Sequence, residues 1–239
     1  MTYGIDVSHH QNPSKLPWSS FRGKVDFLMA RATYGTMPDK FTRSHITQGR
    51  SIGAKVGLYH FYRPTQPWAE QLEVFTRIVE QVCQVGDICP AVDIEKDPFP
   101  APGHPVDSTW SEPCRLFTDN LVHRFGDAIV YITQREWRSL GSVNWVLNRP
   151  LWVAHYTSNP QPATPGNVVP YIWQHRVAPF VHNGTGGYDK NHPDLDQNRG
   201  IKPLPLIKRI TSPLLEDFDH ELDKGILQCF DYTPLDSEG

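Results

Sequence analysis

The sequence has few cysteines, and their spacing matches no known disulfide or metal-binding motif. Four thiols among 239 residues are too few for a disulfide framework, and no two have the CxxC spacing of a zinc knuckle. We expect plain buried thiols, with a Cys83–Cys89 disulfide as the alternative. Cysteine usage therefore does not fix the redox compartment.

Long apolar runs are also missing. No stretch approaches the roughly 18 apolar residues of a membrane-spanning helix. Residues 1–6 lack the charged and apolar regions of a Sec-type signal peptide. We therefore expect no membrane partner and no Sec signal peptide.

The sequence has no strong excess of charge of either sign. It carries 23 basic and 26 acidic residues, for a net charge of -3, so no basic field is available to hold a nucleic-acid backbone. Apolar residues make up 38% of the chain, which is typical of a globular protein rather than a disordered one. Nucleic acid is not an expected partner.

Several catalytic motifs are absent. There is no HExxH, GxSxG, Walker loop or GxGxxG turn, which argues against zinc proteases, esterases, and nucleotide or dinucleotide enzymes. Eleven histidines are present, but none pairs with cysteine at zinc spacing. We expect neither a metal nor a cofactor.

What the sequence does contain is an alternation of short β-branched or aromatic runs with longer segments of helical period, which predicts parallel β/α units. Strands are expected at residues 3–8, 25–33, 56–62, 88–95, 128–133, 151–156 and 171–174. Helices are expected at about 41–53, 67–85, 111–125 and 134–147. After residue 147 the expected strands come close together, as in a barrel whose final part has lost its helices. A proline-rich stretch at 97–112 should lie on the functional rim.

The segment from residue 200 onward differs from the rest. Residues 200–239 hold four basic and eight acidic residues, so this C-terminal extension is acidic while residues 1–199 are nearly neutral. We expect a main domain at 1–199 and an irregular extension at 200–239. The extension is either a docking segment for a virion or assembly partner or an ordered strap packed on the barrel.

Two carboxylates follow one predicted strand, in Ala-Val-Asp-Ile-Glu at residues 91–95. Because residues i and i+2 of a strand face the same side, Asp93 and Glu95 should share one space. Their repulsion should raise one pKa, which gives the pair of carboxyl groups that glycosidic cleavage uses. The alternatives are a solvated strand end and a pair of metal ligands.

Two further acids are candidates. Asp6 ends the first predicted strand, where active-site residues of parallel barrels gather, although an aspartate there is often only a cap or turn former. Asp196 is the other candidate, with an Asx turn as its alternative role.

Aromatic side chains gather at the same predicted strand ends. Singly, each is typical of core packing, but together with amide groups they indicate a sugar cleft. The predicted substrate-binding residues are Tyr34, Tyr59, Phe61, Tyr62, Trp152, Tyr156, Trp173 and Gln174.

Seven segments taken in order carry a family resemblance. They are GIDVSHHQ at 4–11, ARATYG at 30–35, GLYHF at 57–61, DIE at 93–95, LWVAHY at 151–156, WQ at 173–174 and DQN at 196–198. The chain resembles the glycoside hydrolase family 25 muramidases, the Chalaropsis-type lysozymes, over residues 3–198. The resemblance implies an α/β fold, a TIM-like (β/α)5(β)3 barrel that cleaves the β-1,4 bond between N-acetylmuramic acid and N-acetylglucosamine in peptidoglycan glycan strands.

The resemblance also implies roles for the four acids. Glu95 would be the general acid and Asp93 its partner, while Asp6 and Asp196 would shape the electrostatics and hold substrate. We expect Asp93 and the aromatic wall to raise the pKa of Glu95. Asp93 would then orient the substrate's acetamido group, with direct attack by Asp93 or an activated water as the other routes.

The chain departs from the family in three places. Arg31 stands where lysine is frequent, the proline-rich stretch after Glu95 looks like an insertion, and the acidic extension has no recognised counterpart. A chitinase barrel would have an acid at position 91, which here is Ala91. A non-catalytic glycan-binding module is the alternative function. A phage lysin acting on the bacterial cell wall is the expected setting, with an effector exported by a dedicated machine and a secreted bacterial or fungal enzyme as alternatives.

Overall fold

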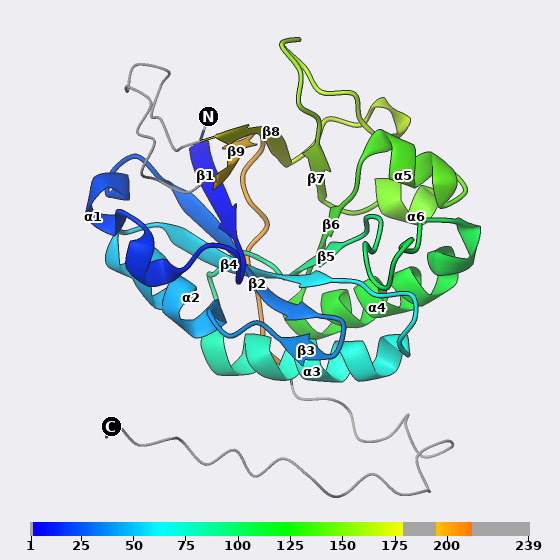
Figure 1. Cartoon of the computed structure of the whole chain (residues 1–239), viewed down its shortest axis with the longest axis horizontal. Coiled ribbons are helices and arrows are strands. Elements are labelled where there is room, and N and C mark those ends of the chain that lie inside the picture. Colours follow the sequence, from blue (N-terminus) through cyan, green and yellow to red (C-terminus); the bar gives the residue numbers. More distant parts are fainter. Residues whose placement is uncertain (1, 179–194, 212–239) are drawn as a thin grey trace, which may run out of the picture.

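Strands of the chain close into a barrel in the computed structural model, which describes residues 2–178 and 195–211 (Figure 1). The strands are β1 (Thr2–Val7), β2 (Phe27–Tyr34), β3 (Met37–Pro38), β4 (Lys55–Phe61), β5 (Ala91–Asp93), β6 (Ile129–Tyr131), β7 (Leu151–Ala154), β8 (Ile172–Ala178) and β9 (Leu195–Gly200). Their order is β1-β9-β8-β7-β6-β5-β4-β2-β3, and a further pairing of β1 with β2 closes the ring and leaves β3 outside it. The predicted barrel is confirmed.

The direction of the strands decides which residues meet at each rim. Strands β1, β2, β4, β5, β6, β7 and β8 run parallel to their neighbours in this set. Only β9 is antiparallel to both of its neighbours, β1 and β8. The carboxyl ends of the parallel strands and the amino end of β9 therefore share one rim.

Helices cover the outside of the barrel. They are α1 (Trp18–Phe21), α2 (Thr42–Ser51), α3 (Trp68–Val82), α4 (Ser111–Phe125), α5 (Gln134–Ser139) and α6 (Asn144–Leu147), with short 3-10 turns at Pro13–Lys15, Ser108–Trp110 and Pro165–Asn167. Both α2 and α3 pack on β2, and α4 packs beside α3. No helix of the described ranges is both long and apolar enough to span a membrane.

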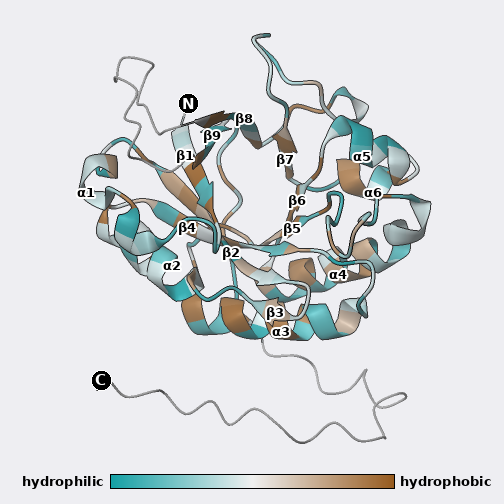
Figure 2. Cartoon of the chain, viewed as in Figure 1, coloured by the Kyte–Doolittle hydropathy of each residue, from teal (hydrophilic) through white to brown (hydrophobic). Residues whose placement is uncertain are grey.

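Helix α3 shows why these segments form helices. Its buried side chains include Leu72, Phe75 and Val79, which recur at helical spacing and form one apolar stripe. Figure 2 shows the resulting mixture of apolar and polar residues along α3. The predicted helix at 134–147 is instead two short helices, because Gly141 and Ser142 have positive φ angles of 100° and 53°.

The barrel wall is buried on both faces. Every residue of β2 except Tyr34 is buried, as expected when side chains of one strand fill the barrel interior and also meet the outer helices. Cys83, Cys89 and Cys114 are buried free thiols, and burial raises the pKa of Cys83 and Cys89 to about 12. The alternative of a Cys83–Cys89 disulfide is therefore wrong, and Cys229 lies outside the described residues.

The start of the C-terminal extension packs against the amino-terminal end of the barrel. Ile207 is buried, and its N–H donates to the Asp87 carbonyl at 2.8 Å. The N–H of Lys208 donates to the carbonyl of Phe125 at 3.1 Å. This part of the extension is thus a strap on the side opposite the shared rim, and residues 212–239 lie outside the described residues.

Candidate active site

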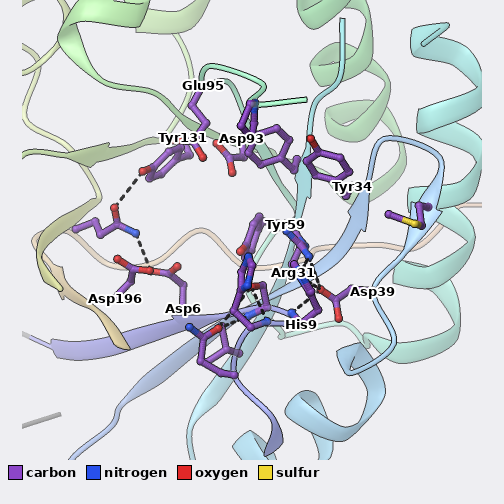
Figure 3. A pocket seen from close by; sticks show the side chains of 18 of the residues that line it. Asp6, His9, Arg31, Tyr34, Asp39, Tyr59, Asp93, Glu95, Tyr131 and Asp196 are labelled. Carbon is purple, nitrogen blue, oxygen red and sulfur yellow. Dashed lines mark hydrogen bonds and ion pairs between the residues drawn. The ribbon is translucent and has the colours of Figure 1, made fainter. Parts of the chain in front are cut away.

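The four acids predicted from the sequence line one cavity of about 910 Å³ at the shared rim. Asp6 comes from β1, Asp93 ends β5, Glu95 follows in a bend, and Asp196 comes from β9. Figure 3 shows Asp6 beside Asp196 on one side of the cavity and Asp93 beside Glu95 on another. The closed sheet therefore brings together acids that are up to 190 residues apart in the sequence.

Asp6 is held by two amide groups. Its Oδ2 accepts hydrogen bonds from Gln174 Nε2 at 2.9 Å and from Asn198 Nδ2 at 2.7 Å. Burial, and next the neighbouring Asp196, raise the pKa of Asp6 well above its usual value, although the two amide bonds act in the opposite direction. Burial also raises the pKa of Asp196.

Asp93 is buried and has an open acceptor. Burial, then Glu95 and Asp6, raise the pKa of Asp93 well above its usual value. Its Oδ1 accepts no hydrogen bond from the part of the chain that the structure describes. A buried carboxylate oxygen without a donor is costly, so this atom is suited to a donor that arrives with a ligand.

Glu95 is half-buried at the cavity wall. Burial is the largest cause that raises its pKa to about 7, followed by the charges of Glu136 and Asp196. Asp93 and Glu95 repel each other, since Glu95 is the largest charge effect on the pKa of Asp93, and Glu136 on α5 is a further negative charge that raises the pKa of Glu95. Glu95 can therefore hold a proton near neutral pH, as a general acid must.

The aromatic wall is tied to the acids by hydrogen bonds. The hydroxyls of Tyr131 and Tyr156 both donate to Gln174 Oε1, at 3.0 and 2.8 Å. Trp152 Nε1 donates to Asn198 Oδ1 at 2.8 Å. Six of the predicted substrate-binding residues line the cavity: Tyr34, Tyr59, Phe61, Trp152, Tyr156 and Gln174.

Tyr62 and Trp173 do not line the cavity, which corrects their predicted placement. Tyr62 packs on the outside of the barrel, with ring centroids 5.9 Å from Trp110 and 6.3 Å from Phe117. Trp173 donates from Nε1 to the His155 carbonyl at 2.8 Å. Tyr62 follows Phe61 and Trp173 precedes Gln174, and both of these neighbours line the cavity. Because successive strand residues point to opposite faces, Tyr62 and Trp173 point outward.

Several residues of the site were not predicted from the sequence, and three of them lie beside the acids or act on them. Tyr131 ends β6, and its position at a strand's carboxyl end was an available signal. Asn198 lies two residues after Asp196, and the same-face rule places it beside Asp6. Glu136 gave no signal, because an acid in the first turn of a helix usually serves the helix dipole.

A buried ion pair supports the floor beside the acids. Arg31 pairs with Asp39 at 2.9 Å, and its guanidinium also contacts His9 Nδ1. Among residues 2–178 and 195–211, no cluster of three or more His, Cys, Asp or Glu side chains could hold a metal ion.

The family model described as "Glycosyl hydrolases family 25" matches residues 5–182. The chain belongs to glycosyl hydrolase family 25. This family 25 protein is therefore a glycoside hydrolase, and the resemblance drawn from its sequence is confirmed.

Solved structures share the fold of this family 25 hydrolase. The bacterial lysozyme of Streptomyces coelicolor is 26% identical, with a TM-score of 0.68, covering 84% of this chain and 92% of the lysozyme. A family GH25 lysozyme of Aspergillus fumigatus is 24% identical, with a TM-score of 0.66, covering 84% of this chain and 94% of that one. The catalytic domain of endolysin ply40 from bacteriophage P40 of Listeria monocytogenes is 18% identical, with a TM-score of 0.57, covering 83% and 92%. No curated protein matches the chain.

Proposed function

We propose that the protein is an N-acetylmuramidase that cleaves the β-1,4 bond between N-acetylmuramic acid and N-acetylglucosamine in peptidoglycan, with Glu95 as general acid. The observation that carries this proposal is the pairing of Glu95, whose pKa is about 7, with the buried Asp93, whose Oδ1 has no donor among the described residues. The lysozymes with the same fold support the substrate class.

In the first step, Glu95 donates its proton to the glycosidic oxygen as the bond from that oxygen to C1 of the muramic acid breaks. Protonation of the leaving oxygen by a positioned carboxylic acid contributes about 10²–10⁴-fold in rate. Glu95 suits this role because burial and neighbouring negative charge keep it protonated near neutral pH.

Asp93 accepts a hydrogen bond from the acetamido N–H of the muramic acid. That bond lowers the pKa of Asp93 in the complex, because a donor to the ionised form favours ionisation. Asp93 is then ionised, and Glu95 keeps its proton. Held in this way, the acetamido oxygen attacks C1 and forms an oxazolinium ring, which water later opens at C1 with return of a proton to Glu95.

The Asp6–Asp196 pair supplies negative charge beside the reacting carbon, and the raised pKa values of both carboxyl groups mean that the two ionise one after the other rather than together. Positive charge develops on the sugar ring in the oxocarbenium-like transition state, so fixed carboxylates at the cavity wall stabilise it. Gln174 and Asn198 fix the position of Asp6 through hydrogen bonds of 2.9 and 2.7 Å.

Mass analysis of fragments released from purified peptidoglycan tests the bond specificity. We expect new reducing ends of N-acetylmuramic acid. Reducing-end glucosamine, or release of peptides, would assign a different hydrolase. A non-catalytic glycan-binding module would release no fragment, although the four acids needed for cleavage are all present in one cavity.

We further propose that the protein acts on the bacterial cell wall as a phage lysin. The fold is shared with phage endolysins as well as with bacterial and fungal enzymes. Co-expression with a holin in a bacterial host tests this role: rapid lysis is expected, and intact cells would contradict it. Residues 212–239, which would carry a virion or assembly contact, lie outside the described residues.

A further inference from the structure

Two large apolar side chains stand exposed at one rim of the cavity. Phe99 is 63% exposed and Met37 is 61% exposed, and both line the cavity together with their neighbours Pro98 and Pro38. We call Met37, Pro38, Pro98 and Phe99 the apolar lip. Apolar side chains grouped at the edge of a groove are typical of a ligand-binding surface.

The lip lies at the end of the cavity opposite Asp196. Met37 pairs with Tyr34 across β2 and β3, and the Tyr34 hydroxyl donates to the Asp97 carboxylate just before Pro98. Figure 3 shows Tyr34 and Asp196 on opposite sides of the cavity. A strand of sugars running through the cavity past Glu95 would therefore reach the lip beyond the cleaved bond.

The backbone that carries Phe99 is held in place by a buried ion pair. Asp97 has a fully buried side chain and pairs with Arg63 Nε at 2.9 Å. Asp97 Oδ1 accepts from the Phe99 N–H at 3.0 Å, and Arg63 donates to the Phe99 carbonyl at 3.0 Å. Although burial acts in the opposite direction, the hydrogen bonds that Asp97 accepts from Tyr34, Arg63 and the Phe99 N–H lower its pKa.

Further contacts hold the loop that carries Phe99. Asp97 and His104 exchange two backbone hydrogen bonds, of 3.0 and 2.7 Å, which join the two ends of the loop. The Arg63 guanidinium lies 4.7 Å from the centroid of the Tyr34 ring. The backbone at Phe99 is thus held by hydrogen bonds to Arg63 and to the buried Asp97 carboxylate, while Phe99 itself is 63% exposed. A backbone held in this way fixes the position of an aromatic ring without covering it.

We propose that Phe99 and Met37 form an additional sugar-binding subsite that covers the apolar face of a pyranose ring of the glycan strand, at least one sugar away from the bond that is cleaved. This inference rests on the proposed function, because it takes the glycan as the occupant. The glycan is favoured because the lip is continuous with the cavity that holds the catalytic acids. An aromatic face against ring C–H groups gives affinity without requiring a particular substituent pattern.

Length-defined glycan strands test the subsite. Wild-type protein, Phe99→Ala and Phe99→Trp are compared on fragments of four sugars and of at least eight sugars, with KM and kcat measured separately. Val85→Ala is the matched control, since Val85 is 61% exposed and does not line the cavity. The Phe99→Ala change should raise KM for the long strand about three- to tenfold and leave kcat unchanged. The short fragment, Phe99→Trp and the control should show little change.

Binding of the same strands to the Glu95→Gln variant, with and without Phe99→Ala, measures the subsite without cleavage. If wild-type protein cleaves no peptidoglycan, the proposed function fails, and length-dependent binding still reports on the lip. Equal weakening for both lengths, or no change for the long strand, overturns the subsite. In the latter outcome Phe99 would be left free for a protein partner instead of a sugar.

Discussion

Asp6 and Asp196 are directly opposite each other on the antiparallel strands β1 and β9. Like charges in direct cross-strand positions destabilise a sheet, and the barrel accepts this arrangement at one rim. The electrostatic effect appears in the pKa of Asp6, which Asp196 raises after burial does. The two acids thus repel each other at the site where a positive charge develops during glycoside cleavage.

Asp196→Asn should stabilise the protein at the expense of activity. The pKa values of Asp6 and Glu95 are raised in the folded protein. The stability that these groups contribute is therefore fully present below their unfolded pKa values. It is lost as the pH rises through the folded pKa, which for Glu95 is about 7. The wild-type Tm should therefore fall between about pH 5 and pH 8. At the upper pH the variant should melt about 2–4 °C higher than wild type. Thermal melts at both pH values check this, and a variant that melts lower at pH 8 would contradict it.

The alkaline limb of the pH profile should depend on Glu136. Glu95 acts in its protonated form, so kcat/KM should fall as the pH rises above about 7. Glu136→Gln removes a neighbouring negative charge that raises the pKa of Glu95 and keeps the size of the side chain, so the limb should move to lower pH by about half a unit or more. The profile of kcat/KM against pH measures this for the free enzyme. Glu73→Gln, an exposed change on α3, serves as the control, and an unmoved limb in Glu136→Gln would exclude the coupling.

Peptidoglycan without N-acetyl groups on its muramic acid should resist cleavage. If the acetamido oxygen attacks C1, its removal should lower the rate at least about 10²-fold. Asp93→Asn should then cost little further on the deacetylated substrate, although it costs much on the acetylated one. Product analysis by NMR should show retention of the β-anomer. Inversion, or equal rates on both substrates, would exclude participation of the acetamido group.

Asn198→Ala should weaken the fold as well as the site. The change leaves Trp152 Nε1 without its acceptor and Asp6 Oδ2 without one of its two donors, and all three residues are buried. Each unsatisfied buried group costs about 1–3 kcal/mol, so the urea midpoint should fall clearly. Asn159→Ala in an exposed loop is the matched control. A midpoint equal to that of the control would show that the Asn198 amide contributes nothing to the fold.

The sequence predicts the barrel strands well because their side chains are apolar and bounded by turn residues. The same-face rule also places Asp93 and Glu95 in one cavity, although β5 ends at Asp93. Clustering of aromatic residues at strand ends is a weaker guide, because it predicts Tyr62 and Trp173 in the cleft. Alternation along β8, and along β4 continued one residue past its end, turns both of them outward.

Strand β9 illustrates what local pattern does not show. Its sequence, Leu-Asp-Gln-Asn-Arg-Gly, lacks the β-branched and aromatic residues of a strand and reads as a loop. It is a strand because β1 and β8 each present an unpaired edge, and β9 satisfies both. Similarly, Glu136 raises the pKa of Glu95 because α5 packs at the rim, and the spacing of residues along the sequence does not predict that contact.

The most direct test of Glu95 as the proton donor compares leaving groups. Glu95→Gln should lower turnover of peptidoglycan by about 10³-fold or more, while an aryl muramide glycoside whose leaving group needs no protonation should lose much less. Both rates are measured on one preparation, with Tm as the check on folding. A variant that keeps near-wild-type turnover of peptidoglycan, or loses both activities equally, would contradict the assignment of Glu95 as general acid.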